Sequence, residues 1–238
     1  MDEKILQLKK WIDESDNVVF FGGAGVSTES GIPDFRSVDG LYNQKYKFPP
    51  EMILSHSFFV KNPEEYYRFH HEKLAIGDVK PNTAHLKLAE LEQKGKLKAV
   101  VTQNIDGLHQ AAGSKKVLEL HGSILRSYCC TCGRPYPADK MNYCEGVPRC
   151  SCGGVIRPDI VLYEEPLDEQ IMQESIRCIS EADVLIVGGT SLNVYPAAGL
   201  INYYRGNKLV LVNLSSTPYD SEADLVINEK IGKVFGQL

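Results

Sequence analysis

Short, strongly apolar runs recur along the whole chain and alternate with amphipathic helical patterns. Several runs are continuous, rich in β-branched residues and bounded by Gly, Asn or Asp, as is typical of buried parallel strands. The runs cover residues 17–21, 97–101, 116–120, 159–163, 183–188, 208–212 and 224–227, and helical patterns cover about 84–95, 168–180 and 196–205. This alternation predicts an α/β fold built on a Rossmann-like, doubly wound parallel sheet.

The composition limits the classes of partner. A chain of 238 residues with a net charge of −5 lacks the basic surface that nonspecific binding to nucleic acid or anionic membranes requires. The charged N-terminal pattern has no signal-peptide core, and no apolar run approaches the length of a membrane span. We therefore expect a cytoplasmic protein without direct nucleic-acid or membrane partners. In that reducing compartment, clustered cysteines indicate metal binding or catalysis before disulfides.

Six of the seven cysteines lie between residues 127 and 154. Cys129 and Cys132 have the C-x-x-C spacing of a zinc knuckle, whereas Cys130 is too close to Cys132 to be the better member of that pair. The second pair ends at Cys152, in front of two glycines.

The other member of the second pair is less clearly marked. Cys150 is the first choice, although C-x-C is tighter than the usual spacing, and Cys144 is the alternative. Four thiolates form a closed, structural site, so we expect one structural Zn²⁺ held by Cys129, Cys132, Cys150 and Cys152.

Two segments interrupt the strand and helix alternation: residues 31–80, rich in Pro, aromatic residues and His, and residues 122–157, which hold the cysteines. We interpret both as insertions that build a small zinc-binding and helical domain over the carboxyl edge of the sheet. The expected division is a Rossmann-like nucleotide-binding domain (1–35, 81–121 and 158–238), a cofactor loop with a helical insertion (36–80) and a zinc-binding module (122–157).

A glycine-rich turn at residues 22–25 follows the first apolar run and precedes a predicted helix. Glycines there let the backbone approach a pyrophosphate at the helix N-terminus. The pattern departs from G-x-G-x-x-G at Thr28, so an ordinary glycine-rich turn is the alternative interpretation. The following loop carries Asp34, Phe35 and Arg36, residue types that suit a lid over a dinucleotide.

Polar residues follow the run at 97–101. Gln103, Asn104 and Asp106 stand where doubly wound folds bind ligands, although Asp106 could instead cap the next helix. His121 ends another apolar run and is the histidine best placed to act as a general base.

The chain resembles the bacterial, short-form members of the sirtuins, which are NAD-dependent protein deacylases. The matching motifs are GAGVSTESGIPDFR, TQNIDGLH, LHGS, the paired cysteines followed by GGVIRPD, GTSLNVYPA and LVNL, in the family's order and over almost the whole chain. The resemblance implies a cleft for NAD and an acyl-lysine peptide between the two domains. It also implies attack of the acyl oxygen on C1′ of the nicotinamide ribose and departure of nicotinamide. The histidine at position 121 would then deprotonate a ribose hydroxyl, giving lysine and O-acyl-ADP-ribose.

The resemblance also implies residue roles. The catalytic residues would be His121, Asn104 and Asp106. NAD contacts, shared in part with these, would be Ala24, Thr28, Phe35, Arg36, Gln103, Asn104, Ile105, Asp106, His121, Thr190, Ser191, Asn213, Lys230 and Ile231. The peptide would add as a strand between Val161, Leu162 and Tyr163 on one side and Asn193 and Val194 on the other.

The resulting hypothesis is an NAD-dependent protein-lysine deacetylase. A protein mono-ADP-ribosyltransferase and a non-catalytic NAD- or peptide-binding module are the alternatives, the second of which the intact set of Asn104, Asp106 and His121 argues against.

The acyl preference also follows from the resemblance. The sirtuin branch that removes succinyl groups carries a Tyr-x-x-Arg pair. Here Tyr66 and Tyr67 are followed three residues later by Phe69 and His70, and Arg68 is out of register. We therefore expect acetyl and somewhat longer neutral acyl groups to be preferred over succinyl.

Overall fold

The computed structural model describes residues 2–35, 37, 40–44, 46–75, 77–137 and 146–238. Its larger lobe contains a six-stranded sheet in the order β3-β2-β1-β7-β8-β9, and every neighbouring pair is parallel. The strands are β1 (Val18–Gly22), β2 (Leu97–Thr102), β3 (Val117–Glu119), β7 (Val184–Gly188), β8 (Leu209–Val212) and β9 (Leu225–Ile227). The strand order reverses direction between β1 and β7, which is where doubly wound sheets bind ligands. The predicted fold class is confirmed.

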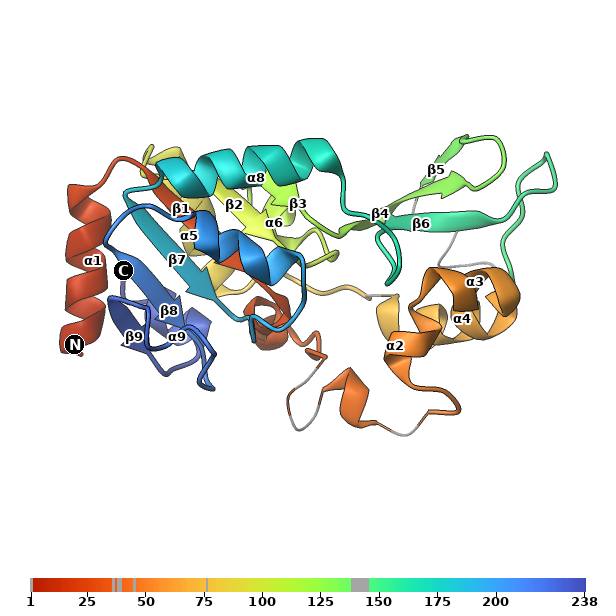
Figure 1. Ribbon diagram of the computed structural model, residues 1–238, viewed down its shortest axis with the longest axis horizontal. Coiled ribbons are helices and arrows are strands. Elements are labelled where there is room, and N and C mark those ends of the chain that lie inside the picture. The colour runs from red at the N-terminus through yellow and green to blue at the C-terminus, as the bar shows by residue number, and fades with distance from the viewer. Residues whose placement is uncertain (1, 36, 38–39, 45, 76, 138–145) are drawn as a thin grey trace.

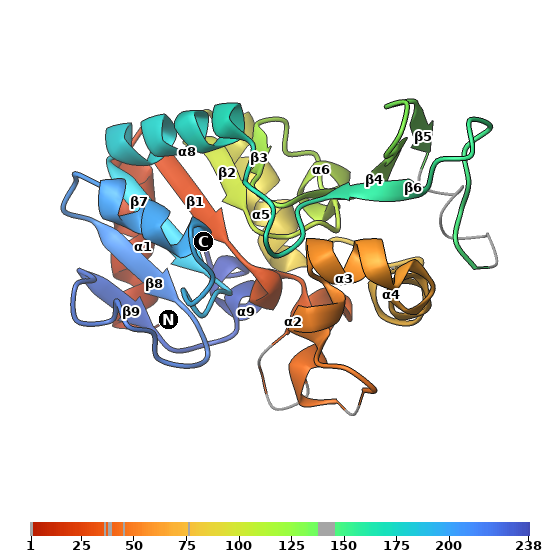
Figure 2. The same ribbon diagram turned by 45° about the vertical axis from the view of Figure 1, so that its right-hand side comes forward.

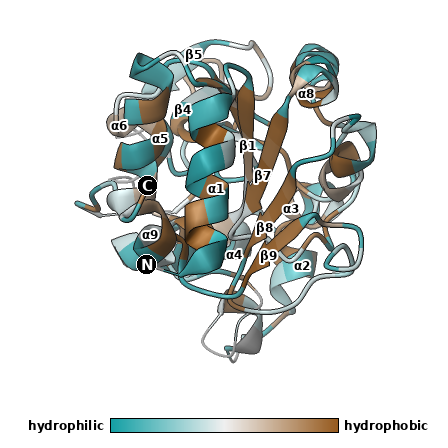
Figure 3. Cartoon of the chain, turned by 90° about the vertical axis from the view of Figure 1, so that its left-hand side faces the viewer, coloured by the Kyte–Doolittle hydropathy of each residue, from teal (hydrophilic) through white to brown (hydrophobic). Residues whose placement is uncertain are grey.

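Helices cover both faces of this sheet because each central strand is apolar on both sides (Figures 1 and 3). One core joins alternate strand residues such as Phe20 and Ile186 to α1, α5 and α9. The other joins the intervening residues, such as Phe21 and Val187, to α8 and the 3-10 segment η5. The bounds are α1 (Glu3–Glu14), α5 (Thr83–Gln93), α6 (Leu108–Ala111), α8 (Glu169–Glu181), η5 (Ala197–Tyr203) and α9 (Ile231–Phe235).

A smaller lobe extends from the carboxyl edge of the sheet (Figures 1 and 2). It combines an antiparallel sheet, in the order β5-β4-β6, with a group of short helices, and a third core joins the two. The elements are α2 (Pro50–Ile53), α3 (His56–Lys61), α4 (Pro63–Phe69), the π-turn η4 (His70–Leu74), β4 (Gly122–Cys129), β5 (Pro135–Pro137) and β6 (Ile156–Ile160).

One apolar run does not join the parallel sheet. Residues 159–163 were expected to form a strand there, but β6 spans Ile156–Ile160 and pairs antiparallel with β4. Ile160 and Leu162 are buried in the third core instead. Their apolar character therefore reflects the small lobe rather than the large sheet. No helix among the described residues is long and apolar enough to cross a membrane.

Three histidines are buried without charge. Burial, with a contribution from the neighbouring His71, lowers the pKa of His70 to about 4. The rings of His85 and His109 have centroids 4.7 Å apart, and burial lowers their pKa values to about 4 and about 3, respectively. Each histidine is neutral in the folded protein at neutral pH.

These histidines predict a loss of stability in mild acid. The unfolded chain binds a proton at each position near pH 6.5, but the folded chain does so only near pH 4 or below. The contribution of these histidines to the free energy of unfolding should therefore be fully present above pH 6.5. It should fall as the pH is lowered from 6.5 to 4. His70→Phe should reduce the fall between pH 7.5 and 5, measured by urea unfolding, by about 2 kcal/mol. An unchanged fall in that variant would contradict the assignment of His70 as a buried neutral histidine.

Candidate functional site

A cavity of about 1000 Å³ lies at the carboxyl edge of the large sheet, between the two lobes. It brings together every predicted cofactor and peptide residue that the structure describes. These are Ala24, Thr28, Phe35, Gln103, Asn104, Ile105, Asp106, His121, Val161, Leu162, Tyr163, Thr190, Ser191, Asn193, Val194, Asn213, Lys230 and Ile231. Arg36 lies outside the described residues.

The glycine-rich turn is followed by two short 3-10 turns, η1 (Ala24–Val26) and η2 (Thr28–Ser30), so the expected α-helix is absent from this described stretch. Gly31 ends the second turn with φ 91°, and Pro33 follows it. A Cβ on Gly23 would come within 2.8 Å of the Thr190 Cβ. The turn therefore presents bare backbone to the cavity, although no helix dipole supports it.

A buried hydrogen-bond network joins the turn to the polar cluster after β2. The Ser27 hydroxyl donates to Asp106 Oδ2 (2.6 Å), and Asn104 Nδ2 donates to Ser27 Oγ (3.1 Å). The other oxygen of Asp106 accepts the N–H of Leu108, the first residue of α6, whose N-cap is Gly107. Ser27 was not predicted as a site residue, because a serine in a glycine-rich turn is ordinary until its partners are known.

His121 follows β3, and a hydrogen bond to the backbone orients its side chain. Its Nδ1 lies 2.9 Å from the Gln103 carbonyl oxygen, which can only accept, so Nδ1 carries the proton. Nε2 therefore has a lone pair. Burial lowers the pKa of His121 below its usual 6.5, opposed by the hydrogen bond to Gln103. The arrangement supplies a neutral imidazole with an unprotonated nitrogen at the cavity wall.

A second series of hydrogen bonds crosses the point between β1 and β7 where the strand order reverses. Gln103 Nε2 donates to Thr190 Oγ1 (3.0 Å), and the Thr190 N–H donates to Asn213 Oδ1 (2.9 Å). Asn213 Nδ2 is buried and has no partner among the described residues. A buried amide donor left unpaired at a cavity wall fits a ligand that accepts a hydrogen bond there.

The predicted peptide side is anchored by a partly buried ion pair between Arg157 and Glu165. Arg157 donates to both carboxylate oxygens of Glu165, at 2.6 and 2.9 Å, and the Leu162 N–H donates to Glu165 Oε2 (2.8 Å). Burial alone would raise the pKa of Glu165, but hydrogen bonds from Arg157, His56 and the Leu162 N–H lower it to about 2. The anchor is therefore ionised at neutral pH and fixes the segment after β6.

This anchoring limits which backbone groups can pair with a peptide. Tyr163 donates its N–H to the Leu54 carbonyl and accepts the His56 N–H, while the Leu162 carbonyl accepts the Glu165 N–H. Within the part of the chain described, the Val161 carbonyl and the Glu164 N–H make no backbone hydrogen bond outside the regular strands. The Val161 carbonyl and the Glu164 N–H are therefore candidates for backbone pairing with a peptide.

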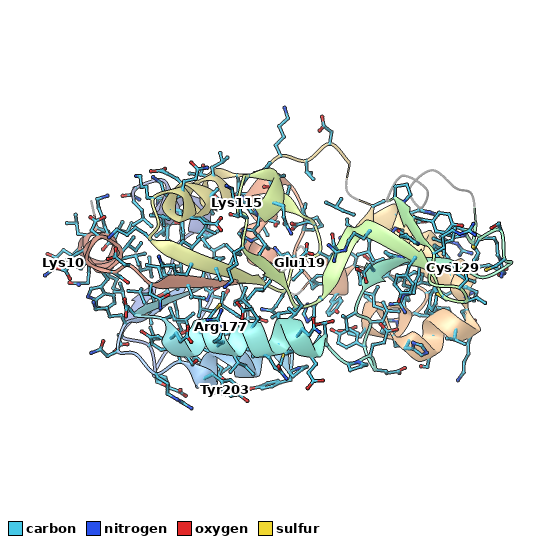
Figure 4. All side chains as sticks on the ribbon, turned by 90° about the horizontal axis from the view of Figure 1, so that it is seen from above. Lys10, Lys115, Glu119, Cys129, Arg177 and Tyr203 are labelled. Atoms are coloured by element: carbon cyan, nitrogen blue, oxygen red, sulfur yellow. The ribbon has the colours of Figure 1, made fainter. Side chains whose placement is uncertain are left out.

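Four cysteine sulfurs gather at the far end of the small lobe, where Figure 4 shows Cys129, remote from Lys10 on α1. The sulfurs of Cys129, Cys132, Cys150 and Cys152 all lie within 4.8 Å of one another, with Cys129–Cys152 at 3.5 Å and Cys132–Cys150 at 3.7 Å. Zinc–sulfur bonds of about 2.3 Å place tetrahedral ligands about 3.8 Å apart, so the set fits Zn²⁺.

Two glycine-ended turns build this cluster. The Gly133 N–H donates to the Cys129 carbonyl, and the Gly153 N–H donates to the Cys150 carbonyl. The turn that carries the C-x-C pair is therefore one residue shorter than the turn that carries the C-x-x-C pair. A Cβ on Gly154 would lie 2.7 Å from Cys129 Sγ. Cys130 is exposed and outside the cluster, and Cys144 lies outside the described residues.

Comparison with known proteins agrees with this arrangement. The sequence profile described as the Sir2 family matches residues 23–196. The chain belongs to the Sir2 family. It is 61% identical over 242 residues to a Clostridium perfringens protein named NAD-dependent protein deacetylase, covering 100% of this chain and 99% of that protein. A Clostridium acetobutylicum protein of the same name is 60% identical over 98% of this chain and 96% of its own length.

Solved Sir2 structures share the fold. A Sir2 complex with a p53 peptide and NAD⁺ has a TM-score of 0.88 and 43% identity, covering 100% of this chain and 97% of that one. A complex with deacetylated p53 peptide and 3′-O-acetyl-ADP-ribose has a TM-score of 0.91 and 42% identity, covering 98% and 96%. The sirtuin resemblance seen in the sequence is therefore confirmed.

The zinc ligand set of this Sir2 chain can be tested directly. We expect about one zinc per purified, unchelated chain, and most of it should be lost in Cys150→Ser because three thiolates no longer close the site. Cys144→Ser and Cys130→Ser are the matched controls and should retain zinc by elemental analysis. Loss of zinc in Cys144→Ser with retention in Cys150→Ser would reassign the ligand.

Proposed function

We propose that this sirtuin is an NAD-dependent protein-lysine deacetylase, acting in the cytoplasm on acyl-lysine proteins and releasing nicotinamide, lysine and O-acetyl-ADP-ribose. The main support is that one cavity is lined by both residue sets, those expected for NAD and those expected for the peptide. A cavity of this size suits two substrates that react with each other directly.

The NAD side would be held mainly by backbone and amide groups. The turn after β1 offers a close approach to the pyrophosphate, and the Asn213 amide offers an unpaired donor to the adenosine half. Asn104 and Asp106, fixed through Ser27, would orient the ribose and the nicotinamide carboxamide. Orientation matters because attack on C1′ requires the acyl oxygen close to the ribose face from which it attacks.

His121 would act as the general base. With Nδ1–H donating to the Gln103 carbonyl, the Nε2 lone pair can accept a proton from a ribose hydroxyl. Depression of its pKa by burial keeps the ring unprotonated at neutral pH. Zn²⁺, held by the four cysteines in the small lobe, would be structural, because all four of its ligand positions are filled by protein.

The proposed reaction can be separated from its alternatives in one assay. Incubation with NAD and an acetyl-lysine peptide, followed by mass spectrometry, should show nicotinamide release that requires the acetyl group, together with equal amounts of lysine peptide and O-acetyl-ADP-ribose. ADP-ribosylated peptide would instead indicate a transferase, and the absence of nicotinamide release would indicate a binding module.

His121→Ala should lower kcat for deacetylation by about 10²- to 10⁴-fold while retaining the fold and much of the NAD binding. The base must be unprotonated, and burial lowers the pKa of His121 below its usual 6.5. The titration of His121 should therefore leave kcat/KM of the unaltered protein constant above pH 6.5 and lower it only at more acidic pH. Near-normal turnover in His121→Ala would rule out this base.

The described contacts favour neutral acyl groups. The Tyr67 hydroxyl donates to the Ile156 carbonyl, His70 is buried with a pKa of about 4, and Arg68 is exposed and paired with Glu65. None of these three offers a charged partner to a carboxylate, and burying a carboxylate without one costs several kcal/mol.

We therefore expect acetyl-lysine to exceed succinyl-lysine in kcat/KM by at least about 100-fold on one peptide sequence. Propionyl-lysine is the matched control, since it adds length without charge and should be accepted; a related Sir2 structure is described as bound to a propionylated peptide. Equal turnover of the succinyl peptide would contradict this preference.

A further inference from the structure

Two tyrosine side chains link segments expected to contact different substrates. The hydroxyl oxygens of Tyr42 and Tyr163 lie 2.9 Å apart, although the residues are 121 positions apart in the chain. Both tyrosines line the cavity. Tyr42 belongs to the 3-10 turn η3 (Leu41–Asn43), and Tyr163 follows β6.

Tyr42 is tied to the loop that carries Phe35. The Tyr42 N–H donates to the Phe35 carbonyl (2.8 Å), and the two rings pack edge to face with centroids 5.4 Å apart. The Leu41 N–H donates to the Asp34 carbonyl (2.8 Å), which closes the loop on itself. A displacement of the Tyr42 ring therefore displaces Phe35, which is expected on the nicotinamide side.

Tyr163 is held through its backbone but keeps an accessible side chain. Its N–H and carbonyl are bonded to Leu54 and His56 at 2.9 and 3.0 Å, whereas 38% of its surface is exposed. Its neighbours Val161 and Glu164 carry the carbonyl and the N–H that, among the described residues, are candidates for pairing with a peptide. A peptide strand added there would lie against the Tyr163 ring.

The hydroxyl contact is a weak source of stability. Exchanging one exposed hydroxyl–hydroxyl bond for bonds to water changes the free energy of folding little, and backbone hydrogen bonds already hold both residues. Its main consequence is that the positions of the two rings depend on each other.

On the basis of the proposed function, we propose that Tyr42 and Tyr163 are paired positioning residues that transmit peptide occupancy to the nicotinamide side. A bound acyl-peptide fixes the position of the Tyr163 ring. The hydrogen bond between the two hydroxyls, here called the tyrosine bridge, then fixes Tyr42, and the Tyr42 ring packs Phe35 against the cofactor. The two substrates then favour each other's binding through one hydrogen bond, a coupling that must be reciprocal.

Initial rates over a grid of NAD and acetyl-peptide concentrations give the factor by which each substrate changes the other's binding. This factor does not depend on the fraction of active enzyme. Tyr42→Phe and Tyr163→Phe should each reduce it about two- to tenfold, and the double variant should be no worse than either single variant. Tyr203→Phe, an exposed tyrosine on η5 that Figure 4 shows away from the small lobe, is the control and should leave the factor unchanged.

Unchanged coupling in the single variants, or additive losses in the double variant, would overturn the bridge while leaving deacetylation by the unaltered protein in place. Absence of deacetylation by the unaltered protein would overturn the proposed function itself, and the bridge with it. Thermal unfolding of each variant confirms that the comparison is made between folded proteins.

Discussion

The close contact between two turns at the carboxyl edge of the sheet sets the geometry of the whole site. The Gly25 N–H donates to the Gly189 carbonyl (2.8 Å), and a Cβ on Gly25 would lie 2.8 Å from the Gly189 Cα. A Cβ on Gly189, where φ is 61°, would lie 2.4 Å from the Val26 nitrogen. This contact fixes the turns after β1 and β7 against each other. Ser27 and Thr190, which organise the two halves of the cofactor side, are held in position as a result.

The small lobe supplies the other wall of the cavity and packs around a core that includes two of the cysteines. Cys129 and Cys150 are buried in the third core, where short helices contribute aromatic residues such as Phe59 and Tyr67. Arg157 lies over the Phe59 ring and holds Glu165, which in turn fixes Leu162 at the cavity. The cysteine cluster and Leu162 therefore share one core, which connects the cluster to the wall of the cavity.

The sequence predicts best those features that are fixed by local pattern. The run at 17–21 is continuously apolar after Asn17, so its place in a buried sheet follows from its local pattern alone. The segment 159–163 has the same pattern, but its partner β4 is chosen by tertiary packing, which no local pattern records. A helix after the glycine-rich turn was expected from the motif, but the chain forms two 3-10 turns, and the second ends at Gly31 with φ 91°. Ser27 can be recognised as a site residue only from its hydrogen bonds with Asn104 and Asp106, which are about 80 residues away in sequence.

In the proposed reaction, NAD and the acyl-lysine meet in one cavity, and the acyl oxygen bonds directly to C1′ of the nicotinamide ribose. The most direct measurement labels the acetyl carbonyl of the substrate lysine with oxygen-18 and locates the label in the products by mass spectrometry. Direct attack of the acyl oxygen on C1′ predicts that the label is carried to the C1′ oxygen of the ADP-ribose product. Recovery of the label in free acetate, with an unlabelled ribose, would show that water cleaves the amide and would contradict the proposed reaction.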